Sequence, residues 1–133
     1  MMQSGKYWIG DLCYVMNDHW DEVCQLTIRG HDVKDGEFIL SNGVRFACYS
    51  TYYGDGEYSD NNGNLYGVDA GLIGCIRLED IHDVDSDIDS GHVFTFETEF
   101  KTKEDNGLIN FGHINIETKD NEYDIDEVKE EED

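Results

Sequence analysis

Residues 37–52 read EFIL-SNG-VRFACYSTY and contain the strongest local signal in the chain. Two runs rich in aliphatic and aromatic residues flank Asn42-Gly43. An Asn-Gly pair between such runs is typical of a β-hairpin, because a type I′ turn needs positive φ at both central residues. We therefore expect a hairpin with a type I′ turn at this pair.

Residues 92–116 have a similar pattern and predict a second hairpin. In its first half, phenylalanines alternate with polar residues, as in a half-buried strand. A turn near Asp105-Asn106-Gly107 leads into a return strand whose apolar residues change phase. A β-bulge at Gly112-His113 would bring all of them onto one face, since one extra residue reverses the alternation. These apolar residues are Ile109, Phe111, Ile114 and Ile116.

Other short apolar runs complete a β-rich pattern. One helix is expected near residues 18–25, with Asn17 as its cap and Trp20, Val23 and Cys24 on its apolar face. The fold class is all-β or β-rich α+β, an antiparallel sandwich or small barrel of about 7–9 strands. We expect one domain over residues 1–118 and a frayed or disordered acidic tail over 119–133. The further strand material lies at 6–10, 12–16, 57–59, 65–68 and 72–78.

Acidic residues dominate the composition. The 133 residues include 31 acidic and 9 basic ones, a net charge of -22, and residues 79–133 hold 20 of the acidic residues but only 4 basic ones. Direct binding to nucleic acid or to an anionic membrane is therefore not expected, because both need clustered Lys and Arg. Aromatic residues make up 12% of the chain, which favours a packed core over disorder.

The N-terminal residues contain no signal-peptide-like apolar run, and no segment is long and apolar enough to predict a membrane span. We expect a cytoplasmic protein. Cys13, Cys24, Cys48 and Cys75 lie far apart in the sequence, which favours reduced, buried thiols over a disulfide framework.

Metal binding and catalysis have little support in the sequence. The aspartates over residues 83–89 alternate as in a calcium loop, but no EF-hand register places Gly at the sixth and Glu at the twelfth position. The histidines and cysteines lack zinc-site spacings, and no pattern indicates a cofactor. No nucleophile and base are singled out, so we do not expect an enzyme.

Two clusters of glycine and aspartate, at residues 7–15 and 53–58, have two interpretations. In the first, they are tight turns in which Asp caps the backbone and Gly supplies positive φ. In the second, they form a cleft beneath aromatic rings together with Asp69, which lies in the sequence Val68-Asp69-Ala70-Gly71. The residues of that cleft would be Asp11, Cys13, Tyr14, Asp55, Tyr58 and Asp69.

An anion site would have to use the three arginines Arg29, Arg45 and Arg77, with Lys6 and Lys34 as further candidates. These residues are scattered along the chain, and the negative net charge repels anionic ligands. Such a pocket therefore requires that they converge in space, for example between protomers of a homo-oligomer.

The clusters also carry a resemblance. The pattern Y-W-I-G-D-x-C-Y at residues 7–14, the segment with Trp20 and Cys24, Y-G-D-G-x-Y at 53–58 and V-D-A-G-x-I-G at 68–74 resemble a group of small bacteriophage and bacterial proteins with no established activity. The resemblance covers residues 5–77. It implies a phage-like origin and supplies no catalytic residues.

The favoured hypothesis is an inhibitor or counter-defence protein that binds a basic host protein and imitates nucleic acid through its acidic surface. One alternative is a sponge for a small signalling molecule such as a nucleotide, and another is an enzyme of unknown reaction. The acidic surface would comprise Asp83, Asp85, Asp87, Asp89, Glu97, Glu99, Asp120, Asp124 and Asp126.

Overall fold

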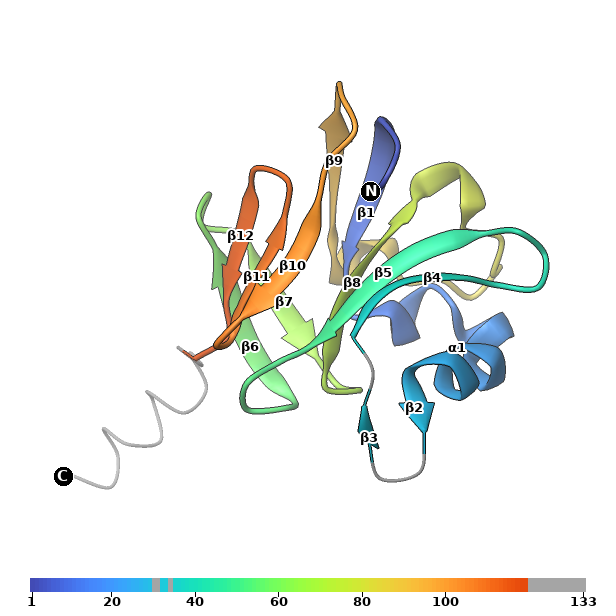
Figure 1. Cartoon of the computed structure of the whole chain (residues 1–133), viewed down its shortest axis with the longest axis horizontal. Helices are drawn as coiled ribbons and strands as arrows, with labels where there is room; N and C mark the ends of the chain where they lie inside the picture. Colours follow the sequence, from blue (N-terminus) through green and yellow to red (C-terminus); the bar gives the residue numbers. More distant parts are fainter. Residues whose placement is uncertain (30–31, 34, 120–133) are drawn as a thin grey trace, which may run out of the picture.

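The computed structural model describes residues 1–29, 32–33 and 35–119 of the chain (Figure 1). Of the tail expected over 119–133, all residues after Lys119 therefore lie outside the described residues.

Within the described residues, ten strands form two five-stranded antiparallel sheets, and no barrel closes. Sheet 1 has the order β4-β5-β8-β1-β9 and sheet 2 the order β10-β11-β12-β6-β7. The β-rich antiparallel architecture with one short helix is thus confirmed. Sheet 1 consists of β1 (Gly5–Gly10), β4 (Gly36–Ile39), β5 (Arg45–Ser50), β8 (Leu72–Arg77) and β9 (His92–Phe96). Sheet 2 consists of β6 (Gly56–Asp60), β7 (Leu65–Val68), β10 (Thr102–Asp105), β11 (Leu108–Phe111) and β12 (Ile114–Glu117).

Short helical segments form a third layer beside sheet 1, opposite sheet 2 (Figure 1). The chain passes from η1 (Leu12–Tyr14) through η2 (Asn17–His19) into α1 (Trp20–Thr27). A two-stranded ribbon of β2 (Ile28–Arg29) and β3 (Asp32–Val33) follows. Two further turns of helix, η3 (Leu78–Asp80) and η4 (Ile88–Ser90), flank the acidic segment before β9.

The central strands of sheet 1 are buried on both faces. On β1, Tyr7 and Ile9 belong to the core shared with sheet 2, whereas Trp8 belongs to the core shared with the helical layer. All three side chains are at most 1% exposed. This double burial explains why β1, β5 and β8 are apolar at consecutive positions, whereas the sheet 2 strands alternate between buried and exposed residues.

The hairpin over residues 37–52 is confirmed as the pair β4–β5. Its turn differs from the expected type I′ geometry, because Gly43 has a φ of 92° while Asn42 does not have a positive φ. The Gly43 N–H donates to the Leu40 carbonyl, and the Leu40 N–H donates to the Val44 carbonyl. The loop therefore has three residues and ends in a left-handed glycine, the next most common hairpin connection.

The predicted pairing of the second hairpin, between the strand that begins at His92 and the strand that begins at Leu108, is wrong. β9 pairs with β1, from Gly5 opposite Phe96 to Ile9 opposite His92, and completes sheet 1. The strand that leads into the turn at Asn106 is instead β10. The physical reason is burial: beside β1, Phe96 packs edge-on against Tyr7 in the core between the two sheets.

The expected bulge at Gly112-His113 is a two-residue turn between β11 and β12, and Phe111 lies directly opposite Ile114. Only Gly112 of this turn has positive φ, as in a type II′ turn. The four apolar residues do share the buried face, because direct cross-strand partners point to the same side. A type I′ turn occurs at Asn106-Gly107, where both residues have positive φ.

The expected helix is confirmed and extends from a 3₁₀ turn at Asn17 through Thr27. Asn17 is not its cap: the residue before η2 is Met16, which makes no capping hydrogen bond through its side chain. Asp83 from a distant loop accepts from the Asp18 N–H instead. The strand expected at 12–16 is also absent, because η1 turns the chain there.

Gly74 in β8 packs too closely for any side chain. A Cβ there would lie 2.4 Å from the Ala47 carbonyl oxygen and 2.6 Å from Leu12. We expect Gly74→Ala to lower the free energy of unfolding by about 2–3 kcal/mol, because a backbone atom cannot give way. The matched control is Gly67→Ala in β7, where a Cβ meets nothing within 4 Å. Urea unfolding measures both, and equal stabilities would contradict the packing described for sheet 1.

The β6–β7 turn predicts a pH dependence of stability. Burial pushes the pKa of Asp60 up, but hydrogen bonds from Tyr66, Asn64 and Asn62 outweigh it and hold that pKa below its ordinary value. Because the pKa of Asp60 is lower in the folded protein, its carboxylate stabilises the fold at pH values above the unfolded pKa of 3.8. This stabilisation is lost as the pH falls through the folded pKa. We expect Asp60→Asn to be less stable than wild type at neutral pH and to lose less stability on acidification. Thermal unfolding across acidic pH tests this, and parallel profiles would contradict it.

Candidate functional site

The Asp11 carboxylate joins two distant turns. Asp11 is 0% exposed, and its Oδ1 accepts from the Cys13 N–H at 3.0 Å. Its Oδ2 accepts from the backbone N–H groups of Asp69 and Ala70 at 2.8 and 2.7 Å. Three backbone donors thus satisfy a buried charge, which makes Asp11 the cap of η1 and the clamp on the β7–β8 turn.

Cys13 and Tyr14 lie beside this carboxylate. The Tyr14 hydroxyl donates to Asp69 Oδ2 at 2.5 Å, and this hydrogen bond raises the pKa of Tyr14. Burial, followed by the nearby Asp11 and Asp69, raises the pKa of Cys13 to about 12. A nucleophilic cysteine needs the opposite surroundings, with a cation or helix N-terminus that favours the thiolate. The arrangement therefore offers Cys13 no activation.

The structure brings together four of the six expected cleft residues: Asp11, Cys13, Tyr14 and Asp69. Tyr58 is buried elsewhere and donates to the Gly54 carbonyl at 2.9 Å. Asp55 is exposed and makes no hydrogen bond with the described residues. The contacts of the four grouped residues are those of tight turns, the first of the two interpretations.

All four cysteines are free thiols. Cys48 and Cys75 are buried as expected, whereas Cys13 and Cys24 are half-buried.

Residues 83–89, here called the acidic loop, carry four aspartates and lie in the connection between η3 and β9. The Trp8 indole N–H donates to the Ile88 carbonyl at 2.9 Å, and the Asp87 N–H donates to the Tyr14 carbonyl at 2.9 Å. Asp83 accepts from the backbone of Asp18 and of Asp85. These contacts hold the loop against η1 and η2.

Two residues that fix this loop do not appear among the sequence candidates. Trp8 supplies the indole donor, and Gly91 allows the close approach: a Cβ on Gly91 would lie 2.4 Å from the Trp8 ring and 2.5 Å from the Ile9 carbonyl. The sequence contains both residues, but only the fold shows that Gly91 and the Trp8 ring lie side by side although they are far apart in the chain.

The acidic loop and the Glu97-Thr98-Glu99 segment do not form one surface. The acidic loop is followed by Ser90 and Gly91, which lies beside Ile9, whereas Glu97 follows Phe96, which lies opposite Gly5. The five residues of β9 separate Gly91 from Glu97, a distance of about 20 Å along the strand. Glu97 and Glu99 line a separate cleft of about 640 Å³ together with Lys101 and His113. The third group of acidic candidates, Asp120, Asp124 and Asp126, lies outside the described residues.

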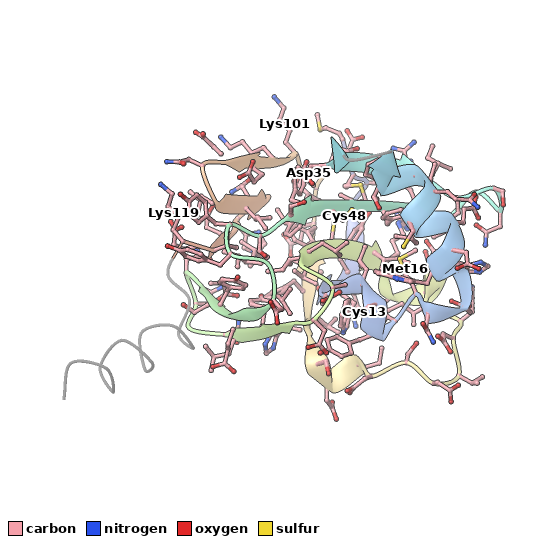
Figure 2. The ribbon with its side chains drawn as sticks, turned by 90° about the horizontal axis from the view of Figure 1, so that it is seen from below. Cys13, Met16, Asp35, Cys48, Lys101 and Lys119 are labelled. Atoms are coloured by element: carbon pink, nitrogen blue, oxygen red, sulfur yellow. The ribbon has the colours of Figure 1, made fainter. Side chains whose placement is uncertain are left out.

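The lysines labelled in Figure 2 lie away from the acidic loop. In that view Lys119 lies at the left, toward sheet 2, Lys101 lies at the upper edge, and Met16 of the helical layer lies toward the right. In the part of the chain that the structure describes, no cationic group lies within 4.0 Å of a carboxylate of the acidic loop. The loop therefore presents uncompensated negative charge.

Two of the three arginines converge. Arg45 and Arg77 line one cleft of about 340 Å³ with Gln3, Tyr7, Gly43, Glu79 and Asp80. Lys6 lines a neighbouring cleft that shares Arg77. Arg29 lies in β2, and Lys34 is outside the described residues.

Among residues 1–29, 32–33 and 35–119, no three His, Cys, Asp or Glu side chains group so that they could hold a metal ion. In the same residues, no helix has the length and apolarity needed to cross a membrane.

Asp11 allows the two interpretations of the cluster to be separated. We expect Asp11→Asn to lower the free energy of unfolding by about 2–4 kcal/mol. The asparagine amide has one acceptor oxygen, and its NH2 group would face a backbone N–H that now donates to the carboxylate. Asp55→Asn, which changes the charge equally at an exposed position, should leave stability within about 0.5 kcal/mol. Chemical unfolding compares the two variants. A stable Asp11→Asn protein would contradict the capping role.

Comparisons of the whole chain found no match among protein-family models, among curated proteins or among solved structures.

Proposed function

We propose that this chain is a protein-binding inhibitor of phage type that docks its acidic loop on the basic, nucleic-acid-binding surface of a partner protein in the host cytoplasm. The observation that carries the proposal is the acidic loop itself, which hydrogen bonds hold in place and whose carboxylates have no cationic group within 4.0 Å among the described residues.

Rigidity supports binding because a preorganised surface loses little conformational entropy on association. The loop is fixed at three points, through Asp83, Asp87 and Ile88, each of which contacts a different part of the helical layer or β1. Asp85, between the first two of these points, and Asp89, directly after the last, are both exposed. Their carboxylates make no hydrogen bond with the described residues and are free to accept from an arginine or lysine of a partner.

Neighbouring carboxylates extend the surface. Asp18 adjoins the loop through the hydrogen bond from its N–H to Asp83, and Asp69 adjoins it through Tyr14, whose carbonyl accepts from Asp87. Fixed charges of one sign raise the rate of encounter with an oppositely charged protein, and the effect weakens as salt screens it. Such an array competes for the residues that a nucleic-acid backbone would contact.

An exposed apolar residue favours a protein as the partner. Val84 is 96% exposed near the start of the acidic loop, and Ile88 is 37% exposed near its end. An ion or a small cation gains nothing from these side chains, whereas a protein surface can bury them. The combination of apolar residues with surrounding carboxylates resembles the core and rim of a protein interface.

The test compares two double variants with the same change in charge. Asp85→Asn/Asp89→Asn removes two charges from the acidic loop, and Glu97→Gln/Glu99→Gln removes two from the other end of β9. The probe is a fluorescein-labelled arginine-rich peptide bound to duplex DNA, and the measurement is displacement of the DNA at several salt concentrations. We expect wild type to displace the DNA, the loop variant to be about tenfold weaker and the control to be within about threefold of wild type.

Equal losses in the two variants would mean that net charge alone attracts the peptide, and would overturn the role of the acidic loop. Failure of the wild-type protein to displace DNA, even at low salt, would overturn the nucleic-acid-mimic proposal as a whole. Thermal unfolding of each variant shows that a loss of displacement reflects the surface and not the fold.

A further inference from the structure

We propose that the cleft between Arg45 and Arg77, here called the arginine cleft, binds the phosphate group of a small anionic molecule. The site lies apart from the acidic loop, and the inference does not depend on the proposed function. It assigns a binding role to two of the few cationic residues in a chain of net charge -22.

Strand register places the two arginines side by side. Phe46 of β5 lies opposite Ile76 of the antiparallel strand β8. Arg45 precedes Phe46 and Arg77 follows Ile76, so the same register places the two arginines opposite each other. Arg77 in turn lies opposite Tyr7 of β1. The three side chains thus form a row across the end of sheet 1, a convergence that their sequence separation does not reveal.

The Arg77 guanidinium is held in place by groups that leave it charged. Its Nη2 donates to the Ser4 carbonyl at 2.7 Å and to Gln3 Oε1 at 3.1 Å. Its central carbon lies 5.9 Å from the centre of the Tyr7 ring. Because Nη2 already donates to these two oxygens, Nη1 is the terminal nitrogen that an anion contacts, as its hydrogen bond to the Glu79 carboxylate shows.

Arg45 supplies further donors across the cleft. One of its terminal nitrogens donates to the Met1 carbonyl at 3.1 Å, and the side chain is otherwise exposed. Gly43 lines the same cleft and leaves it open, since a Cβ at this position would meet nothing within 4 Å. The volume of about 340 Å³ is at the small end of the range for ligand sites and fits a small phosphorylated molecule.

Glu79 now occupies the place that a ligand anion would take. Its Oε1 accepts from Arg77 Nη1 at 3.0 Å, but its side chain is 72% exposed. An exposed ion pair is weak because water and salt screen it. A phosphate, which presents more acceptor oxygens and contacts both arginines, would displace this carboxylate and pair with Arg77 and Arg45 together.

The experiment uses the full chain and inorganic pyrophosphate, with adenosine monophosphate as a second probe, in isothermal titration calorimetry at constant ionic strength. We expect saturable binding of pyrophosphate by wild type. Arg45→Gln should weaken it at least about fivefold without changing the melting temperature, because Arg45 is exposed and makes one hydrogen bond. Arg77→Gln should abolish it, and Arg45→Gln keeps the test valid if Arg77→Gln unfolds.

Glu79→Gln gives an effect of the opposite sign. Removing the competing carboxylate should strengthen pyrophosphate binding by about threefold or more. The matched control is Asp85→Asn, which removes the same charge at the other end of the sheet and should change the affinity much less.

Absence of saturable binding in the wild-type protein would overturn the proposal. So would pyrophosphate binding that persists in both arginine variants, or a gain in Glu79→Gln no larger than in Asp85→Asn, since either shows that the anion does not occupy the arginine cleft. Because DNA displacement by the acidic loop is measured separately, failure of one proposal is distinguishable from failure of the other.

Discussion

The burial of β1 on both faces is the constraint on which the rest of the structure depends. Tyr7 and Ile9 fill the core between the two sheets, and Trp8 fills the core beneath the helical layer. A strand in this position must be apolar at consecutive residues and must have a neighbour on each side, which β8 and β9 provide. Both layers therefore assemble around six residues near the start of the chain.

The two ends of β1 have opposite chemical character. At its C-terminal end lie the buried Asp11 and the acidic loop, which Trp8 holds through its indole N–H. At its N-terminal end, Tyr7 supports Arg77 beside Arg45. Charge is thus organised along one strand, although the composition alone shows only a large negative excess. The two proposed sites follow from this separation, since a cation-rich partner and a small anion would approach different ends.

Sequence reasoning identified the residue types of the candidate sites better than their arrangement. Asp11 stands out in the sequence because it follows Gly10, and the structure shows that its carboxylate clamps backbone groups. Asp85 and Glu97 have similar exposure and charge, yet they lie at opposite ends of β9. The sequence does not single out Trp8 and Gly91, because a ring in a core and a glycine after a turn have no distinguishing local pattern. Their role depends on a contact between distant segments.

The sequence by itself determined the β-rich class, the short helix and the positions of most turns. Asn-Gly pairs, left-handed glycines and alternating apolar residues act through local sterics and are present in the unfolded chain as preferences. Only the tertiary structure decided that β9 pairs with β1, that Gly112 turns the chain instead of bulging it, and that Arg45 and Arg77 line one cleft. Strand pairing is chosen by which arrangement buries the most apolar surface, and that comparison involves residues far apart in the chain.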